Sequence, residues 1–150
     1  MITPIEIVEN VRDALESRNY KKFAECFHED GIYERPYALK GTVHQYEGID
    51  EIYNYIATGM AAANKLFEII SVEVELHPCA EQNVIFAEFF LSGKSTKTTE
   101  TFRIASSAAL IFCNGDKIVK YRDFPNSAGI AQAAGTLPQY TESLSLIKVN

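Results

Sequence analysis

The fold is decided by the stretch Asn114-Gly115-Asp116-Lys117-Ile118-Val119-Lys120-Tyr121-Arg122-Asp123-Phe124-Pro125. The pair Asn114-Gly115 is typical of a two-residue β-hairpin turn, because both central residues of such a turn need a positive φ, which asparagine and glycine tolerate best. Residues 106–113 are therefore predicted to form the incoming strand and residues 117–124 the outgoing strand. The outgoing strand should end at Pro125, because proline cannot donate a hydrogen bond to a ladder.

Side chains alternate across the predicted outgoing strand. One face is expected to carry Ile118, Lys120, Arg122 and Phe124, and the other Val119, Tyr121 and Asp123. The second face would deliver a carboxylate beside a phenol into a mostly apolar cavity, which makes Asp123 a candidate catalytic acid or base. The alternative is that Asp123 caps the turn or helix after Pro125, or pairs with a base such as Arg122 at the surface.

The composition predicts a single domain over residues 1–150, with residues 136–150 as a C-terminal tail. Hydrophobic residues make up 47% of the 150 residues and charged residues 23%, which is ordinary for a globular protein.

The net charge of −6 comes without a basic block, so we expect no nucleic-acid partner. No run approaches the roughly 18 apolar residues of a membrane span. No secretory leader is evident at the N-terminus, so a cytoplasmic location is expected.

The metal-ligating residue types show no spacing that would build a metal site. Cys26, Cys79 and Cys113 are widely spaced, and so are the three histidines. An odd number of cysteines without paired spacing indicates free thiols in a reducing compartment. No glycine-rich phosphate loop is present, so we predict that the protein binds neither a metal ion nor another cofactor.

The order of elements predicts an α+β fold. Three helices come first: from the capping box at Thr3-Pro4-Ile5-Glu6, at residues 20–27, and after Gly48 with a buried stripe of Ile49, Ile52, Tyr53 and Ile56. Strands are predicted at residues 32–37, 65–78, 84–91, 100–113 and 117–124. Segregated helices and strands of this kind give a curved antiparallel sheet wrapped around the N-terminal helices, a cone with an internal pocket.

The strand predicted from Lys65 also suggests a partner surface. Strict alternation places Leu66, Ile70 and Val72 on one face and Phe67 and Ile69 on the other. If the second face is the one that no helix covers, it exposes an apolar patch, and such a patch normally marks an interface. We therefore expect a homodimer formed through the sheet.

Three segments of the chain resemble a known superfamily. They are Glu29-Asp30-Gly31 through Tyr33-Glu34-Arg35-Pro36-Tyr37, then Tyr46-Glu47-Gly48-Ile49-Asp50-Glu51-Ile52, and the hairpin that ends in Tyr121-Arg122-Asp123-Phe124. In this order, over roughly residues 4–135, they resemble the nuclear-transport-factor-2-like (NTF2-like) superfamily. The nearest branch is that of the SnoaL-like polyketide cyclases, with the phenazine-biosynthesis A/B-like proteins close by. The resemblance implies a cone with a deep pocket and, commonly, a homodimer through the sheet.

Position by position, the resemblance narrows the chemistry. Ketosteroid isomerases carry an aspartate base before the proline that matches Pro36, where this chain has Arg35, and their helix-one tyrosine falls near Val11. Epoxide hydrolases of the limonene type need an Arg and Asp pair on the strand before the last, which residues 105–113 lack. The SnoaL-like pattern remains. This pattern implies that Asp123 is the catalytic acid or base. The family also often has a glutamate at the position of Glu88, which makes Glu88 a second candidate.

The remaining candidate residues leave alternatives open. Glu88, the second catalytic candidate, either pairs with a base such as Arg103 or faces the cavity. Tyr121 would hydrogen-bond a substrate oxygen, while Tyr33 and Phe86 would line a pocket or fill the core. Glu34 and Arg35 lie on opposite faces of one strand, so only one can contact the substrate, and Arg35 there would indicate an acidic ligand.

Two classes of function therefore stand. One is a cofactor-free acid–base enzyme of the isomerase, cyclase or hydro-lyase type, acting on a small apolar or acidic oxygenated molecule. The other is a non-catalytic ligand-binding or assembly module of the same fold. An open cavity with Asp123 at its wall supports the first class, and a filled core supports the second.

Overall fold

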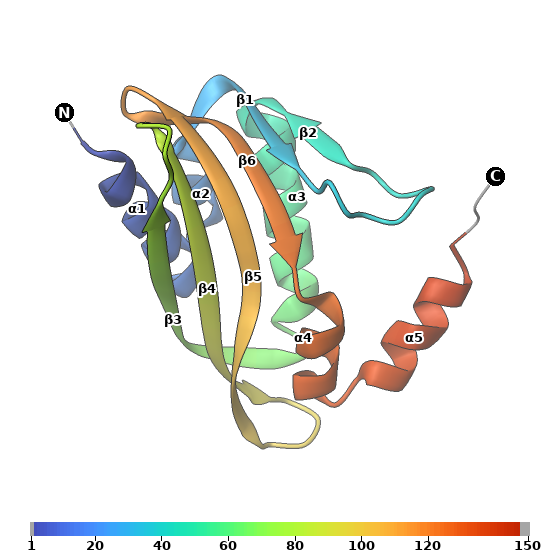
Figure 1. The fold of residues 1–150 in the computed structure, drawn as a ribbon. Helices are drawn as coiled ribbons and strands as arrows, with labels where there is room; N and C mark the ends of the chain where they lie inside the picture. Colours follow the sequence, from blue (N-terminus) through green and yellow to red (C-terminus); the bar gives the residue numbers. More distant parts are fainter. Residues whose placement is uncertain (1, 148–150) are drawn as a thin grey trace.

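The computed structural model describes residues 2–147. Helices and strands follow in the order α1 (Pro4–Glu16), α2 (Tyr20–Glu25), β1 (Phe27–Glu34), β2 (Gln45–Glu47), α3 (Gly48–Ala63), β3 (Phe67–Pro78), β4 (Val84–Ser95), β5 (Thr101–Asn114), β6 (Lys117–Pro125), α4 (Ser127–Ala134) and α5 (Leu137–Ser145). One curved sheet carries α1, α2 and α3 on one side (Figure 1). The predicted α+β fold is confirmed.

The six strands form one sheet in the order β2-β1-β6-β5-β4-β3. Neighbouring strands are antiparallel except β1 and β6, which pair in parallel with Tyr33 opposite Tyr121 and Glu34 opposite Arg122. Residues opposite each other in paired strands project to the same face of a sheet. Tyr33 and Tyr121 therefore share the inner face, against the helices, and Glu34 and Arg122 share the outer face.

The helix α1 begins where the sequence predicts. The Thr3 side chain accepts a hydrogen bond from the Glu6 backbone N–H, and the Glu6 carboxylate accepts one from the Thr3 N–H. This capping box satisfies donors that the helix itself leaves free. The buried stripe is made of Ile7, Val8, Val11 and Ala14, and the side chain of Ile5 is exposed.

The second helix was predicted to end at Phe27 and the first strand to begin at Ile32, and both of these boundaries were wrong. Phe27 begins β1, and the pairing of β1 with β6 is irregular between Phe27 and Ile32. A Cβ atom on Gly31 would lie 2.9 Å from the carbonyl oxygen of His28 and 3.1 Å from that of Ile118. Only glycine allows the two backbones to approach this closely. The strand also ends at Glu34, three residues earlier than predicted.

A bulge in β3 reverses the alternation that the sequence implies. The register with β4 shifts between Ile69 and Ser71. As a result Phe67 and Ile69 point inward, Ile70 is 58% exposed, and Val72 points inward again. A bulge inserts one extra residue and so exchanges the two faces. The prediction that Phe67 and Ile69 lie on the uncovered face was wrong.

A second bulge lies at the start of β6. Cys113 pairs with Ile118 and Phe112 pairs with Lys120, which leaves Val119 without a partner in the ladder. Ile118, predicted for the outer face, is therefore fully buried on the inner face. Beyond the bulge the alternation resumes as predicted, and Tyr121 and Asp123 point inward.

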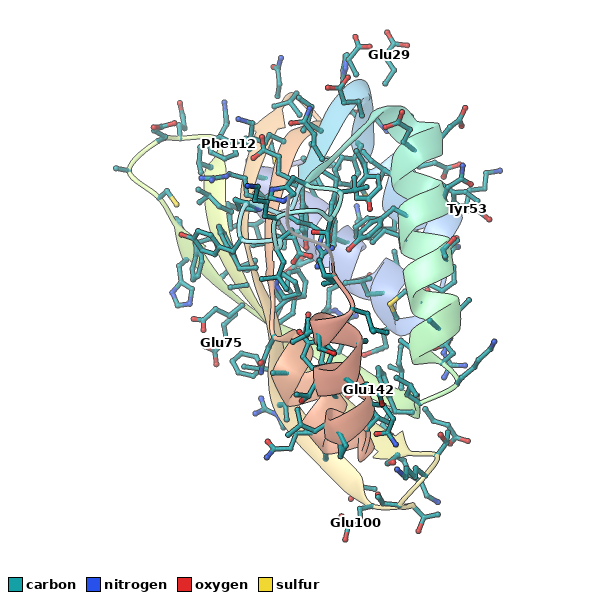
Figure 2. The ribbon with its side chains drawn as sticks, turned by 90° about the vertical axis from the view of Figure 1, so that its right-hand side faces the viewer. Glu29, Tyr53, Glu75, Glu100, Phe112 and Glu142 are labelled. Carbon is teal, nitrogen blue, oxygen red and sulfur yellow. The ribbon has the colours of Figure 1, made fainter. Side chains whose placement is uncertain are left out.

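Three further elements differ from the sequence-based prediction. In α3, Ile52 and Ile56 are buried, but Tyr53 lies on the side that faces away from the sheet (Figure 2). The strand β4 extends to Ser95, four residues beyond its predicted end, and the buried Ser95 hydroxyl donates to the carbonyl oxygen of Ala134, 2.7 Å away, at the end of α4. Most of the predicted tail forms α5, which buries none of its side chains.

Residues 148–150 of the predicted tail lie outside the described residues. Among residues 2–147, no helix combines the length and the apolar character needed to cross a bilayer.

The outer face of the sheet, rather than Phe67 and Ile69, offers an apolar surface. It carries Phe86, Phe90, Leu110, Phe112 and Phe124, all half-buried. These apolar side chains lie among charged ones of the same face, such as Arg122, which is opposite Leu110. We propose that two copies associate through this face, because apolar side chains gathered on one surface normally mark an interface. Light scattering at micromolar concentration should then give twice the chain mass of 16.8 kDa.

The substitution Leu110→Lys places a charge at the middle of this face and should return the mass to that of one chain. The matched control is Ile70→Lys, which changes an exposed side chain on the edge strand β3 and should leave the dimer intact. A wild-type protein of single-chain mass at this concentration would contradict the proposal.

Candidate active site

A cavity of about 330 Å³ lies between the inner face of the sheet and the helices. Its wall is mostly apolar, with side chains such as Phe67, Phe89 and Leu91 from the sheet and Ile56 and Met60 from α3. The polar side chains that line it are Tyr33, Arg35, Tyr55, Ser106, Ser107, Tyr121, Asp123 and Ser127. An apolar cavity with a few convergent polar groups is the usual form of a small-molecule site.

The register of the sheet places two tyrosines side by side at the cavity wall. A single row of paired residues crosses the inner face through Ile85, Ile111, Tyr121, Tyr33 and Tyr46. The rings of Tyr33 and Tyr121 are stacked, with centroids 5.1 Å apart and an interplanar angle of 9°. Both phenols are nearly inaccessible to solvent, so their positions are fixed by packing.

The next row of the inner face carries Asp123. It pairs with Ala109 of β5, which in turn pairs with Ala87 of β4. Both alanine side chains are fully buried. Asp123 is only 7% exposed, and the Tyr33 hydroxyl donates a hydrogen bond to its Oδ2 at 2.5 Å.

Burial controls the protonation of this carboxyl group. Desolvation raises the pKa of Asp123 from 3.8 to about 6, because an apolar environment disfavours the charged form. The hydrogen bond from Tyr33 and the positive charge of Arg35 act in the opposite direction and lower this pKa, but burial dominates. Asp123 therefore exchanges a proton near neutral pH, as a general acid or base must.

The tyrosines around Asp123 keep their protons. Burial raises the pKa of Tyr33 and Tyr121 well above 10, and the nearby charge of Asp123 raises it further. Burial likewise raises the pKa of Tyr55 to about 12. All three phenols are therefore hydrogen-bond donors at physiological pH.

Arg35, and not Glu34, faces the cavity. The parallel register sets Tyr33 beside Tyr121 on the inner face and Glu34 beside Arg122 on the outer face. The next residue, Arg35, lies just beyond the end of β1 and lines the cavity together with Asp123. Its guanidinium carbon lies 5.9 Å from the centroid of the Tyr55 ring. Arg35 and Asp123 are the two charged side chains that line the cavity.

Glu34 was a substrate-binding candidate, but the structure places it away from the cavity. On the outer face its carboxylate lies 3.2 Å from Nε of Arg122 and 3.8 Å from Nζ of Lys120. These ion pairs account for its position. The prediction that Glu34 binds the substrate was therefore wrong.

Glu88 and Phe86 also point away from the cavity. Glu88 Oε1 lies 3.0 Å from Nε2 of His77, and Phe86 packs against the His77 ring with centroids 5.9 Å apart. The base that was expected to pair with Glu88, Arg103, instead contacts Glu73 at 3.0 Å. Because β4 is apolar on both faces, sequence alternation could not show which face is the inner one.

Sequence reasoning missed Tyr55, Ser106 and Ser107. Tyr55 follows the exposed Tyr53 on α3 by two residues, and a rotation of about 200° around a helix explains why one faces solvent and the other the cavity. The two serines belong to a run of small residues in β5, from Ala105 to Ala109, which fits close sheet packing, a subunit contact or a ligand site. The register shift between Phe89 and Phe90 at this point turns both serines toward the cavity.

One group among residues 2–147 has the arrangement of a possible metal site. The ligand atoms of Glu75, His77 and Glu88 lie within 4.8 Å of one another. The group lies on the outer face, and Glu75 is on the side of the sheet opposite α3 (Figure 2). It is therefore separated from the cavity. The absence of a metal ion or other cofactor stays a prediction.

A curved six-stranded sheet packed on three helices around an internal cavity defines the NTF2-like, or cystatin-like, class of fold. Within this class, the sequence profile of the SnoaL-like domain matches residues 8–121. The chain belongs to the SnoaL-like domain family.

Individual relatives agree with this assignment. The uncharacterized protein YesE of Bacillus subtilis (strain 168) is 29% identical over 119 residues, covering 79% of this chain and 78% of YesE. A crystal structure from Bacillus subtilis, named "Putative Isomerase", is similar with a TM-score of 0.70 and 25% identity, over 88% of this chain and 92% of that one. A "putative polyketide cyclase" of Pseudomonas putida KT2440 has the same fold, with a TM-score of 0.62 and 16% identity over 89% of this chain and 99% of that one.

The substitution Asp123→Asn should change how stability depends on pH. The folded-state pKa lies above the unfolded one, so Asp123 contributes stability in full below about pH 4 and loses it as pH rises through about 6. Asparagine does not ionise, so the stability of the variant does not fall in this way as the pH rises. Between pH 4 and pH 8 its free energy of unfolding should gain about 2 to 3 kcal/mol relative to wild type.

The measurement is chemical denaturation of both proteins across this pH range. The control is Asp116→Asn, which removes a carboxylate from the exposed hairpin turn and should follow the wild-type pH dependence. Parallel curves for wild type and Asp123→Asn would contradict the assignment of a buried carboxyl group.

The substitution Tyr33→Phe should raise the pKa of Asp123 above about 6. The Tyr33 hydroxyl stabilises the carboxylate, and its loss removes an influence that lowers this pKa. The titration can be followed by the carboxyl carbon resonance of Asp123. Tyr20→Phe is the control, because that phenol bonds Asn64 outside the cavity. An unchanged or lower pKa in Tyr33→Phe would contradict the prediction.

Proposed function

We propose that this protein is a cofactor-free acid–base enzyme that acts on a small, largely apolar, oxygenated molecule. The reaction would be of the isomerase, cyclase or hydro-lyase type. One observation carries the proposal: Asp123 is buried at the wall of an open apolar cavity, and its pKa of about 6 suits proton transfer near neutral pH.

The proposed mechanism follows from the groups around Asp123. The carboxylate removes a proton from the carbon next to a carbonyl group of the bound molecule. Negative charge then builds on the carbonyl oxygen, and a protonated phenol such as Tyr55 or Tyr121 can stabilise it by donating a hydrogen bond. Asp123, now protonated, returns the proton to another atom of the molecule. The Tyr33 hydrogen bond holds the carboxyl group in place throughout.

The alternative is a ligand-binding or assembly module without turnover. One observation favours it: the carboxyl of Asp123 already receives a hydrogen bond from Tyr33, so the pair is satisfied without a substrate. In this alternative Asp123 shapes the polarity of the cavity and transfers no proton.

Deuterium exchange separates the two functions without knowledge of the net reaction. In ²H₂O the wild-type protein should exchange carbon-bound hydrogen next to the carbonyl of at least one member of a panel of apolar ketones, lactones and polyketide-like acids. The rate should rise with pH through about 6, because the carboxylate is the active form. Asp123→Asn should reduce it by about 10² to 10⁴, the usual contribution of a general base.

Asp116→Asn serves as the matched control and should keep the wild-type rate. Ligand binding is followed in parallel by thermal shift. A panel member that binds the wild-type protein while no member exchanges deuterium would support the binding module and reject the enzyme.

A further inference from the structure

Arg35 lies where two cavities meet. The second cavity, of about 580 Å³, is lined by residues of the loop after β1 and by α5, including Tyr37, Leu39 and Leu144. Arg35, Pro125 and Ser127 line both cavities. Apart from Arg35, no charged side chain among the described residues lines the second cavity. Among residues 2–147, the guanidinium group is therefore the one cationic group that lines both cavities.

The positive charge of Arg35 has no matching carboxylate within residues 2–147. The other ion pairs near the site join Glu34 to Arg122 and Lys120, on the outer face of the sheet. Asp123 is close enough for the Arg35 charge to lower its pKa, but it forms no ion pair with Arg35 within 4.0 Å and bonds Tyr33 instead. Arg35 is partly buried, so its positive charge is available to pair with an anionic ligand at the junction.

The hydrogen-bond donors of Arg35 also indicate an anionic ligand. Its Nε is buried and has no hydrogen-bond partner among residues 2–147. A buried donor without a partner is rare and calls for an explanation. The guanidinium group presents a planar fork of N–H donors, which matches the two oxygens of a carboxylate.

We propose that the ligand of this site is an apolar organic acid, whose carboxylate binds Arg35 at the junction while its apolar portion fills the 330 Å³ cavity. This placement brings carbon atoms of the apolar portion in front of Asp123, which lines the same cavity as Arg35. The inference deepens the proposed function, on which its catalytic meaning rests, and it names the substrate class. The binding of the carboxylate itself does not depend on any turnover.

The experiment compares matched acids and amides by calorimetry at pH 7: cinnamate with cinnamamide, 2-naphthoate with 2-naphthamide, and 4-phenylbutanoate with its amide. Each pair differs in the charge that Arg35 would recognise. The protein is the full-length Asp123→Asn variant, in which the acid–base group is absent and cannot repel the ligand carboxylate. At least one acid should bind about 10- to 100-fold more tightly than its amide, the size of a charge-assisted hydrogen bond.

Two substitutions of Arg35 in the Asp123→Asn protein test whether Arg35 causes the preference for the acid over the amide. Arg35→Gln should abolish it and leave the affinity for the amide within about twofold, and Arg35→Lys should restore part of it. Arg122→Gln, which removes an arginine from the outer face, is the control and should keep the full preference. Circular dichroism checks that each variant is folded.

Two results would overturn the inference: no acid binds more tightly than its amide, or the preference survives in Arg35→Gln. Neither result depends on catalysis, because every protein compared lacks the Asp123 carboxyl group. Failure of the deuterium exchange with retention of the Arg35-dependent preference would reject the enzyme and keep the acid-binding site.

Discussion

The site depends on the parallel pairing of β1 with β6. This pairing joins the strand that leaves the helices to the last strand of the sheet, 88 positions later in the chain at Tyr33 and Tyr121. It stacks the two phenols, brings the Tyr33 hydroxyl to Asp123, and carries Arg35 to the adjacent position. A shift of one residue would send Tyr33 and Arg35 to the outer face and Glu34 into the cavity, because strand side chains alternate. One register thus fixes all the charged groups of the cavity.

The protonation state of Asp123 results from competing physical effects on its carboxyl group. Removal from water raises the pKa of Asp123, while the Tyr33 hydrogen bond and the Arg35 charge lower it. Burial alone would leave an acid that stays protonated near neutral pH, and strong pairing would leave a carboxylate that never accepts a proton. The partial compensation gives an intermediate value of about 6. The Tyr33 hydroxyl contributes to this balance without adding a second group that titrates near neutral pH, because burial raises its own pKa well above 10.

Much of the fold could be predicted from the sequence, because helix caps, the Asn114-Gly115 turn and the hydrophobic periods are local signals. The position of Asp123 was also predictable, since it lies two residues after Tyr121 and beyond the bulge. The errors in the strands involve non-local information. Bulges at Ile70 and Val119 reverse alternation, and they arise from pairing with another strand. Glu88 was misplaced because its strand is apolar on both faces, so that only the arrangement of the helices defines the inner face.

The presence of Arg35, rather than Glu34, at the cavity wall limits which residue can transfer a proton. Where the resemblance to ketosteroid isomerases places an aspartate base, this chain has a guanidinium group, which stays protonated at any physiological pH. Arg35 can attract negative charge but cannot accept a proton. Under the proposed function, Asp123 must therefore both remove and return the proton. Negative charge that develops between these two steps lies in an apolar cavity, where the field of a nearby cation acts strongly. This arrangement favours reactions through an enolate-like intermediate over those that need two carboxyl groups.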